Sequence, residues 1–249
     1  MRRRLVPMRL STHSWTLPAL WIAIAGLSAA GCGGETGRTS ADVTAKKPSA
    51  NFARDVLETD LTIDVAKHRG TAVLRVAGST RKGASFEVGG LDVKSVTDDA
   101  GPVPFQVRDG RLDVDIPAKK PARLTVAYGF KERSKLEGAL RSGSTFLWPY
   151  FCGNLFPCKS GPADGLRFGL KLEGVPDTAV AVHPDAIGAD APSYMIAWAI
   201  GDYTKKSLGT TPAGTHVSVW YLPGEATKAT NFCAVSCPGV APGGVVSAW

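Results

Sequence analysis

Alternation of apolar and polar residues with a period of two is the feature that most restricts the fold of this chain. In the segment L-E-T-D-L-T-I-D-V, residues 57–65, Leu61, Ile63 and Val65 fall on one face of an extended strand. The segment T-A-V-L-R-V-A, residues 71–77, follows a short turn at residues 67–70. We therefore expect a β-hairpin here, with one buried and one solvated face.

Similar runs continue along most of the chain, and Gly, Pro and Asp residues typical of turns separate them. We expect further strands at residues 84–88, 91–97, 111–116, 122–130, 166–172, 178–182, 194–200 and 215–222. No amphipathic helical pattern of ten or more residues interrupts them after the N-terminal region. The sequence thus predicts one all-β domain over residues 54–223, built as an antiparallel sandwich or as saddle-like sheets.

Residues 1–31 are typical of an export signal. Arginines at positions 2, 3, 4 and 9 precede an apolar run of about sixteen residues, 15–30, which is shorter than the roughly 20 residues of a membrane-spanning helix. The run ends at A-A-G-C, residues 29–32, which resembles the lipobox of bacterial lipoproteins. We expect cleavage before Cys32 and a lipid on its thiol; ordinary secretory cleavage is the alternative.

These signals predict a bacterial cell-envelope protein that a lipid holds in the outer membrane or at the cell surface; a periplasmic or secreted protein is the alternative. Residues 32–53 are rich in Gly, Ser, Thr and Lys and predict a flexible tether. Without the four leader arginines, 25 basic residues face 22 acidic ones. Since no basic block with interleaved aromatics remains, we expect no nucleic-acid partner.

The four downstream cysteines form two closely spaced pairs. Cys152 and Cys158 flank G-N-L-F-P, a segment able to turn back on itself, so an exported chain is expected to join them in a disulfide. Cys233 and Cys237 lie in residues 224–249, an irregular tail rich in small residues. A zinc site built from the four is a weaker alternative, because neither pair has the C-x-x-C spacing.

Several motifs follow one another in a characteristic order between residues 57 and 223. They are T-A-V-L-R-V (71–76), L-D-V-K-S-V (91–96), L-T-V-A-Y (124–128), F-P-C (156–158), L-R-F-G-L-K-L-E-G-V-P (166–176) and W-A-I-G-D-Y (198–203). Together they resemble the N-terminal, saddle-shaped β domain of the aminopeptidase N family of zinc metallopeptidases. A generic β-sandwich would account for any one of them alone.

The family's zinc chemistry has no counterpart in this sequence. Its enzymes hold the metal with H-E-x-x-H on one helix, whereas none of the histidines here precedes a glutamate. The stretch T-F-L-W-P-Y, residues 145–150, also lacks the carboxylate that the family places there for the substrate's free amine. We expect no catalytic residue, no metal ligand and no cofactor in this chain.

An aromatic cluster lies in the same region, formed by Phe146, Trp148, Tyr150 and Phe151. Packing in the core or against another domain is its expected role, with ligand binding as the alternative.

The resulting expectation is an exported, lipid-anchored, non-catalytic N-terminal domain of an aminopeptidase N-like metallopeptidase, inactive alone. The loss of the strand pattern after residue 223 suggests a shifted reading frame or a truncated gene, and a genuine short relative is the alternative. Zinc is expected only in a missing catalytic domain, and the expected partner is such a domain or another cell-envelope component. A cell-surface β-sandwich that binds glycans or proteins is the alternative function.

Overall fold

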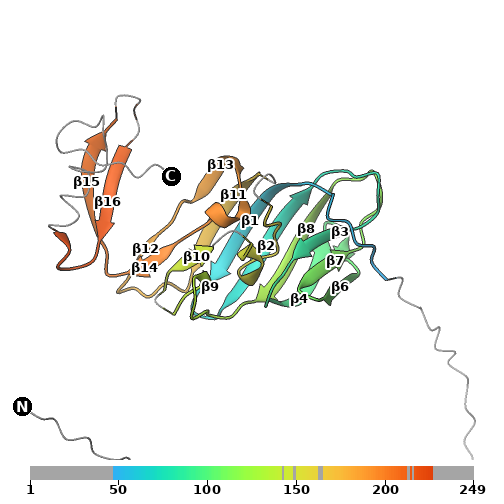
Figure 1. Ribbon diagram of the computed structural model, residues 1–249, viewed down its shortest axis with the longest axis horizontal. Coiled ribbons are helices and arrows are strands. Elements are labelled where there is room, and N and C mark those ends of the chain that lie inside the picture. The colour runs from blue at the N-terminus through green and yellow to red at the C-terminus, as the bar shows by residue number, and fades with distance from the viewer. Residues whose placement is uncertain are drawn as a thin grey trace, which may run out of the picture. The chain divides into compact units, whose positions relative to one another are not determined.

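The computed structural model describes residues 47–141, 143–147, 150–161, 165–211, 214 and 216–226 (Figure 1). The chain divides into two units, Met1–Val43 and Thr44–Trp249, and every described residue belongs to the second. The signal at residues 1–31, the lipid site Cys32, most of the tether and most of the tail, with Cys233 and Cys237, lie outside the described residues. No helix in the described segments is long and apolar enough to cross a membrane.

A seven-stranded sheet dominates the domain, and its strands lie side by side in Figure 1. Their order is β13 (Ala186–Ala191), β11 (Leu166–Glu173), β1 (Val56–Asp64), β2 (Arg69–Val76), β8 (Ala122–Gly129), β4 (Asp92–Asp98) and β5 (Gly101–Pro102). All neighbours pair antiparallel except β1 and β11, which run parallel, with Leu61 opposite Leu170.

Smaller sheets complete the structure. One has three strands in the order β3 (Ala84–Glu87), β7 (Arg111–Val114) and β6 (Phe105–Arg108). Three pairs also form: β9 (Glu137–Ala139) with β10 (Thr145–Leu147), β12 (Val180–Val182) with β14 (Ala199–Gly201), and β15 (Thr204–Thr210) with β16 (His216–Tyr221). Two 3-10 turns, η1 (Cys152–Asn154) and η2 (Ser193–Met195), connect strands.

Period-two alternation explains which face of the large sheet is buried. Leu61 and Ile63 on β1 have 2% and 0% of their surface exposed, whereas Thr62 between them faces outward. Buried side chains of β2 and β8, such as Leu74 and Leu124, join the same core cluster. Phe86 of the three-stranded sheet also belongs to that cluster, so the two sheets share one core.

The all-β prediction is confirmed, including the hairpin of β1 and β2. Two features differ from expectation. The parallel pairing of β1 with β11 makes the large sheet mixed, and the strand expected over residues 194–200 is a 3-10 turn followed by the short β14. Ile196 and Trp198 in this segment are buried, so its apolar residues fill the core without a strand ladder.

The folded body includes residues ahead of position 54, where the β domain is expected to begin. Asn51 is 1% exposed, its backbone amide donates to Ser85 Oγ at 2.8 Å and its carbonyl accepts from the Ser85 amide at 3.1 Å. Arg54 is also 1% exposed. The last residues of the expected tether (32–53) are therefore fixed to the β3 strand through Asn51.

Candidate functional site

Two cavities adjoin at the end of the large sheet where the β1–β2 turn meets the chain after β8. His68 lies between them and lines both. It has a left-handed backbone, with φ of 50°, which costs free energy for a residue with a side chain. Its carbonyl accepts a 3.0 Å hydrogen bond from the Phe130 amide, and the two rings lie 5.6 Å apart. Phe130 thus holds the turn in this conformation.

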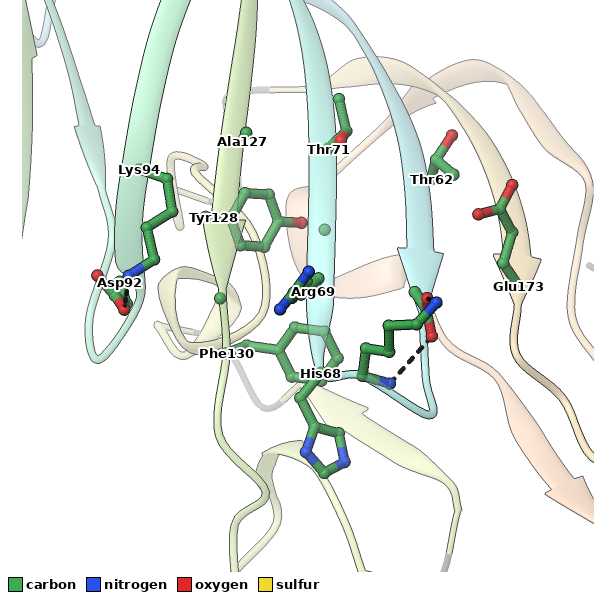
Figure 2. Close-up of a pocket in the computed structure, with 14 residues that line it drawn as sticks. Thr62, His68, Arg69, Thr71, Asp92, Lys94, Ala127, Tyr128, Phe130 and Glu173 are labelled. Atoms are coloured by element: carbon green, nitrogen blue, oxygen red, sulfur yellow. Dashed lines mark hydrogen bonds and ion pairs between the residues drawn. The ribbon is translucent and has the colours of Figure 1, made fainter.

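The first cavity, here called the polar hollow, has a volume of about 580 Å³. Its floor consists of short outward-facing residues of adjacent strands, Thr62, Thr71, Ala127 and Gly129, and Arg69 lies at the strand ends beside them. Figure 2 shows Arg69 between Asp92 on one side and Glu173 on the other. Short side chains on the middle strands and long ones at the rim create the depression.

Most charges around the polar hollow are already paired. Lys67 Nζ lies 2.8 Å from Asp64 Oδ2, and Lys94 Nζ lies 2.5 Å from Asp92 Oδ2. The hydrogen bond from the Lys67 side chain holds the pKa of Asp64 below its usual value. Among the described residues, Arg69 has no ion-pair partner, so its charge stays available inside the depression.

The floor is backed by a close contact between the sheet and its core. Gly70 pairs with Tyr128 across β2 and β8, and a Cβ on Gly70 would overlap the Tyr128 ring. The tyrosine is 2% exposed, and its hydroxyl has no hydrogen-bond partner within the described part of the chain. Burial raises the pKa of Tyr128 because the phenolate would lose its hydration. The glycine is required here because the aromatic ring occupies its side-chain space.

The second cavity, here called the apolar pocket, has a volume of about 210 Å³. Apolar residues from four regions of the chain line it, among them Val65, Phe130, Leu140, Pro176, Trp198 and Ile200. Glu132 is its one lining carboxylate, and its Oε1 lies 3.5 Å from His68 Nε2. Thr145 of β10 holds Trp198 through two backbone-linked hydrogen bonds, of 2.8 and 2.9 Å, so the pocket wall is firmly placed. Its chemistry suits a small apolar group.

Cys152 and Cys158 form a disulfide with a Cα–Cα distance of 6.1 Å. The bond is buried, and an isolated bridge joins Cys158 to Glu87 of β3. It closes the loop that carries the F-P-C motif against the three-stranded sheet.

A zinc ion does not fit the donor groups of the described residues. Glu87, Cys152 and Cys158 are the one set of three donors close enough together, within 4.8 Å, but both sulfurs belong to the disulfide and are not thiolates. His68, His183 and His216 belong to no such set. The His183 ring contacts the Pro184 carbonyl at 3.1 Å, and the His216 ring contacts Thr210 Oγ1 at 3.0 Å.

The predicted aromatic cluster is described only in part. Tyr150 is 69% exposed and has φ of 83°, an unusual backbone conformation for a bulky residue. Phe151 is half-buried, while Trp148 and the side chain of Phe146 lie outside what the structure describes. The cluster as a unit stays a prediction.

The two cavities are absent from the sequence-based expectations. In the sequence, His68 and its neighbours predict an ordinary turn. No sequence motif indicates that this turn lies close to Gly129 or Trp198. Gly70 and Gly129, each inside a strand pattern, were the available signal, since such glycines mark close approach of other groups.

Comparison with known proteins finds similarity in structure alone. No family model matches the sequence, and no curated protein matches it. The M1 zinc metallopeptidase from Deinococcus radiodurans superposes with a TM-score of 0.59 at 18% identity, over 69% of this chain and 48% of that chain. A mutant of that enzyme bound to a Tyr-Ser-Ala substrate gives a TM-score of 0.57 at 16% identity, with the same coverage.

Aminopeptidase A from Legionella pneumophila, in complex with aspartic acid, gives a TM-score of 0.63 at 16% identity. The match covers 73% of this chain and 25% of that one. The chain thus spans about half of the Deinococcus enzyme and a quarter of the Legionella enzyme. At these identities the likeness establishes a shared fold, and it confirms the fold expected from the sequence motifs.

Proposed function

We propose that this chain is a non-catalytic N-terminal β domain of an aminopeptidase N-like, M1-type zinc metallopeptidase. The observation that carries the proposal is the structural match, which covers 69% of this chain but only 48% of the Deinococcus enzyme. The order of sequence motifs, from T-A-V-L-R-V to W-A-I-G-D-Y, supports it independently.

In this proposal the domain positions a zinc-bearing catalytic domain and performs no hydrolysis alone. The proposal assigns no zinc to the described residues, where the cysteines beside Glu87 are oxidised and the histidines are dispersed. Zinc would be held by the catalytic domain, which either belongs to the same protein or is a partner chain.

The proposal also includes export and anchoring. The leader with its terminal A-A-G-C supports cleavage before Cys32 and attachment to the bacterial envelope through a lipid. The mass of the mature chain from envelope extracts, compared with that of Cys32→Ser, tests this step. An unmodified Cys32 in the mature wild-type chain would contradict it.

Tyr150 is the best probe for the expected partner, since an exposed aromatic in a strained backbone suits an interface. We would replace it with a photoreactive phenylalanine analogue in the full chain, cross-link whole cells and identify adducts by mass spectrometry. Val107, which is 43% exposed on β6, provides the matched control position. We expect an adduct with a zinc metallopeptidase catalytic domain from position 150 alone.

Two results would overturn the proposal: adducts with unrelated proteins only, or zinc-dependent cleavage of aminoacyl amides by the purified chain. The alternative, a cell-surface module that binds glycans or proteins, is favoured by the same exposed Tyr150. Retention of an envelope glycan or a non-peptidase protein by the wild type, with loss in Tyr150→Ala, would support it instead.

A further inference from the structure

The polar hollow is arranged in two rows of outward-facing residues that run across the sheet. In the row at the strand ends, Asp64 lies opposite Arg69, Arg69 opposite Gly129, and Gly129 opposite Asp92. In the next row on the same face, Thr62 lies opposite Thr71, and Thr71 opposite Ala127. The register thus places one arginine beside a position with no side chain and above a floor of short, mostly polar residues.

Gly129 leaves room beside the guanidinium. A Cβ at this position would stand 3.8 Å from Asp92 Cβ and 3.8 Å from the His68 carbonyl oxygen, which are ordinary contact distances. The surrounding atoms therefore leave space for a Cβ at position 129. A larger side chain at this position would fill the depression. The cavity of about 580 Å³ is within the size range of small-molecule sites.

The electrostatics favour an anion. Both lysines that line the hollow are compensated by their own aspartates, and Glu173 is compensated by Lys171, 2.7 Å away. Within the described residues the Arg69 guanidinium is left without a carboxylate, although Asp64 lies directly opposite it. A guanidinium offers a planar pair of donors that matches carboxylate and phosphate oxygens.

The floor adds hydrogen-bonding groups. Thr62 and Thr71 each present a hydroxyl that has no hydrogen-bond partner in the described part of the chain. Hydroxyl groups can donate to and accept from a polyhydroxylated ligand. Ala127 beside them provides a small apolar surface against which a carbon skeleton can lie.

We infer that the polar hollow is a binding site for a small, hydroxyl-bearing oxyanion of the sugar-acid or sugar-phosphate class. Arg69 binds the carboxylate or phosphate, and the two threonines contact the hydroxyls. The inference does not depend on the proposed docking of a catalytic domain.

The test is a titration of the full chain at low ionic strength with D-gluconate and with D-glucose 6-phosphate, followed by calorimetry and by amide chemical shifts. D-glucose serves as the uncharged ligand. We expect saturable binding of at least one anion, with shifts centred on residues 62–71 and 127–129, and no binding of glucose. Binding of gluconate alone or of the phosphate alone identifies the recognised group.

Three variants make the test specific. Arg69→Gln should weaken binding about tenfold or more, the equivalent of one charge-assisted hydrogen bond. Gly129→Val should do the same with all charges kept, because it fills the depression. Arg75→Gln is the matched control, since Arg75 is exposed on the same strand but pairs with Glu58 at 2.6 Å, and it should change the affinity less than twofold.

Thermal melting and near-ultraviolet circular dichroism would verify that each variant folds. Equal weakening by Arg75→Gln, wild-type affinity in Gly129→Val, or equal binding of glucose would each overturn the inference, as would the absence of saturable binding by either anion. The first result would indicate nonspecific surface charge, and the second would place the anion outside the hollow.

Discussion

Arg54 is the position where a single substitution should cost the most stability. Its side chain is 1% exposed and has all of its donors engaged, without a carboxylate partner among the described residues. The acceptors are the backbone carbonyls of Gly83 (2.7 Å), Ala77 (3.0 Å), Lys120 (2.7 Å), Arg81 (3.1 Å) and Pro117 (2.9 Å). Desolvation holds the pKa of Arg54 below its usual value, and the group is nevertheless retained as a cation by five carbonyl dipoles.

The magnitude follows from these contacts. Arg54→Met would remove five hydrogen bonds, although the carbonyls of Gly83 and Arg81 would keep a second donor, Asn51 Nδ2, at 3.2 Å each. The carbonyls of Ala77, Lys120 and Pro117 would lose the donor that the described residues give them, at about 1–3 kcal/mol each. The desolvation cost of the guanidinium, several kcal/mol, would be recovered. The three carbonyls left without a donor and the two further lost bonds outweigh this gain, so we expect a net loss of about 3 kcal/mol. For a domain of this size that corresponds to a fall of roughly 10 °C in Tm.

Urea unfolding followed by circular dichroism measures the loss directly. Arg54→Lys should fall between the wild type and Arg54→Met, because an ammonium has only three donors. Arg75→Met is the control, since Arg75 is exposed and makes one surface ion pair with Glu58, so we expect a change below about 1 kcal/mol. A loss of less than about 1 kcal/mol in Arg54→Met would refute the reasoning, because the carbonyls would then be satisfied by other groups.

Three further predictions concern the core. Burial raises the pKa of Tyr128, so the unfolded chain releases the phenol proton near pH 10 whereas the folded state keeps it. Above pH 10 the free energy of unfolding of the wild type should therefore fall by up to about 1.4 kcal/mol per pH unit relative to Tyr128→Phe. Urea unfolding at pH 8 and pH 11 measures this, and an equal difference at both values contradicts it. Replacing Cys152 and Cys158 by serine should cost about 2 kcal/mol, and dithiothreitol should destabilise only the wild type. Gly70→Ala should lower the free energy of unfolding by about 1–3 kcal/mol, because the added Cβ forces the Tyr128 ring to move. Gly188→Ala is the control: no atom lies within 4 Å of its added Cβ, so stability in the same assay should change by less than about 0.5 kcal/mol.

Strands with one buried face could be located from the sequence, because burial of one face produces an alternation of apolar and polar residues within the strand itself. Leu61 and Ile63 alternate with polar residues, and the structure buries them in β1. β15, a strand that was not expected, lacks this alternation. β15 (Thr204–Thr210) is almost wholly exposed, and Leu208 is its one large apolar residue, so no apolar alternation marks it. The parallel pairing of β1 with β11 was also not foreseen, because it joins segments about a hundred residues apart.

The Cys152–Cys158 bond joins cysteines six residues apart, and their spacing in the sequence was enough to predict it. The cavities are different in kind. Arg69, Gly129 and Asp92 become neighbours only through the register of three strands. Trp198, which lines the apolar pocket, is hydrogen-bonded to Thr145, 53 residues earlier in the chain. Local patterns determined the strands and the disulfide, because alternation and loop closure act between nearby residues. The tertiary structure decided that Arg69 lies opposite Gly129 in the polar hollow, because this pairing depends on contacts between distant parts of the chain.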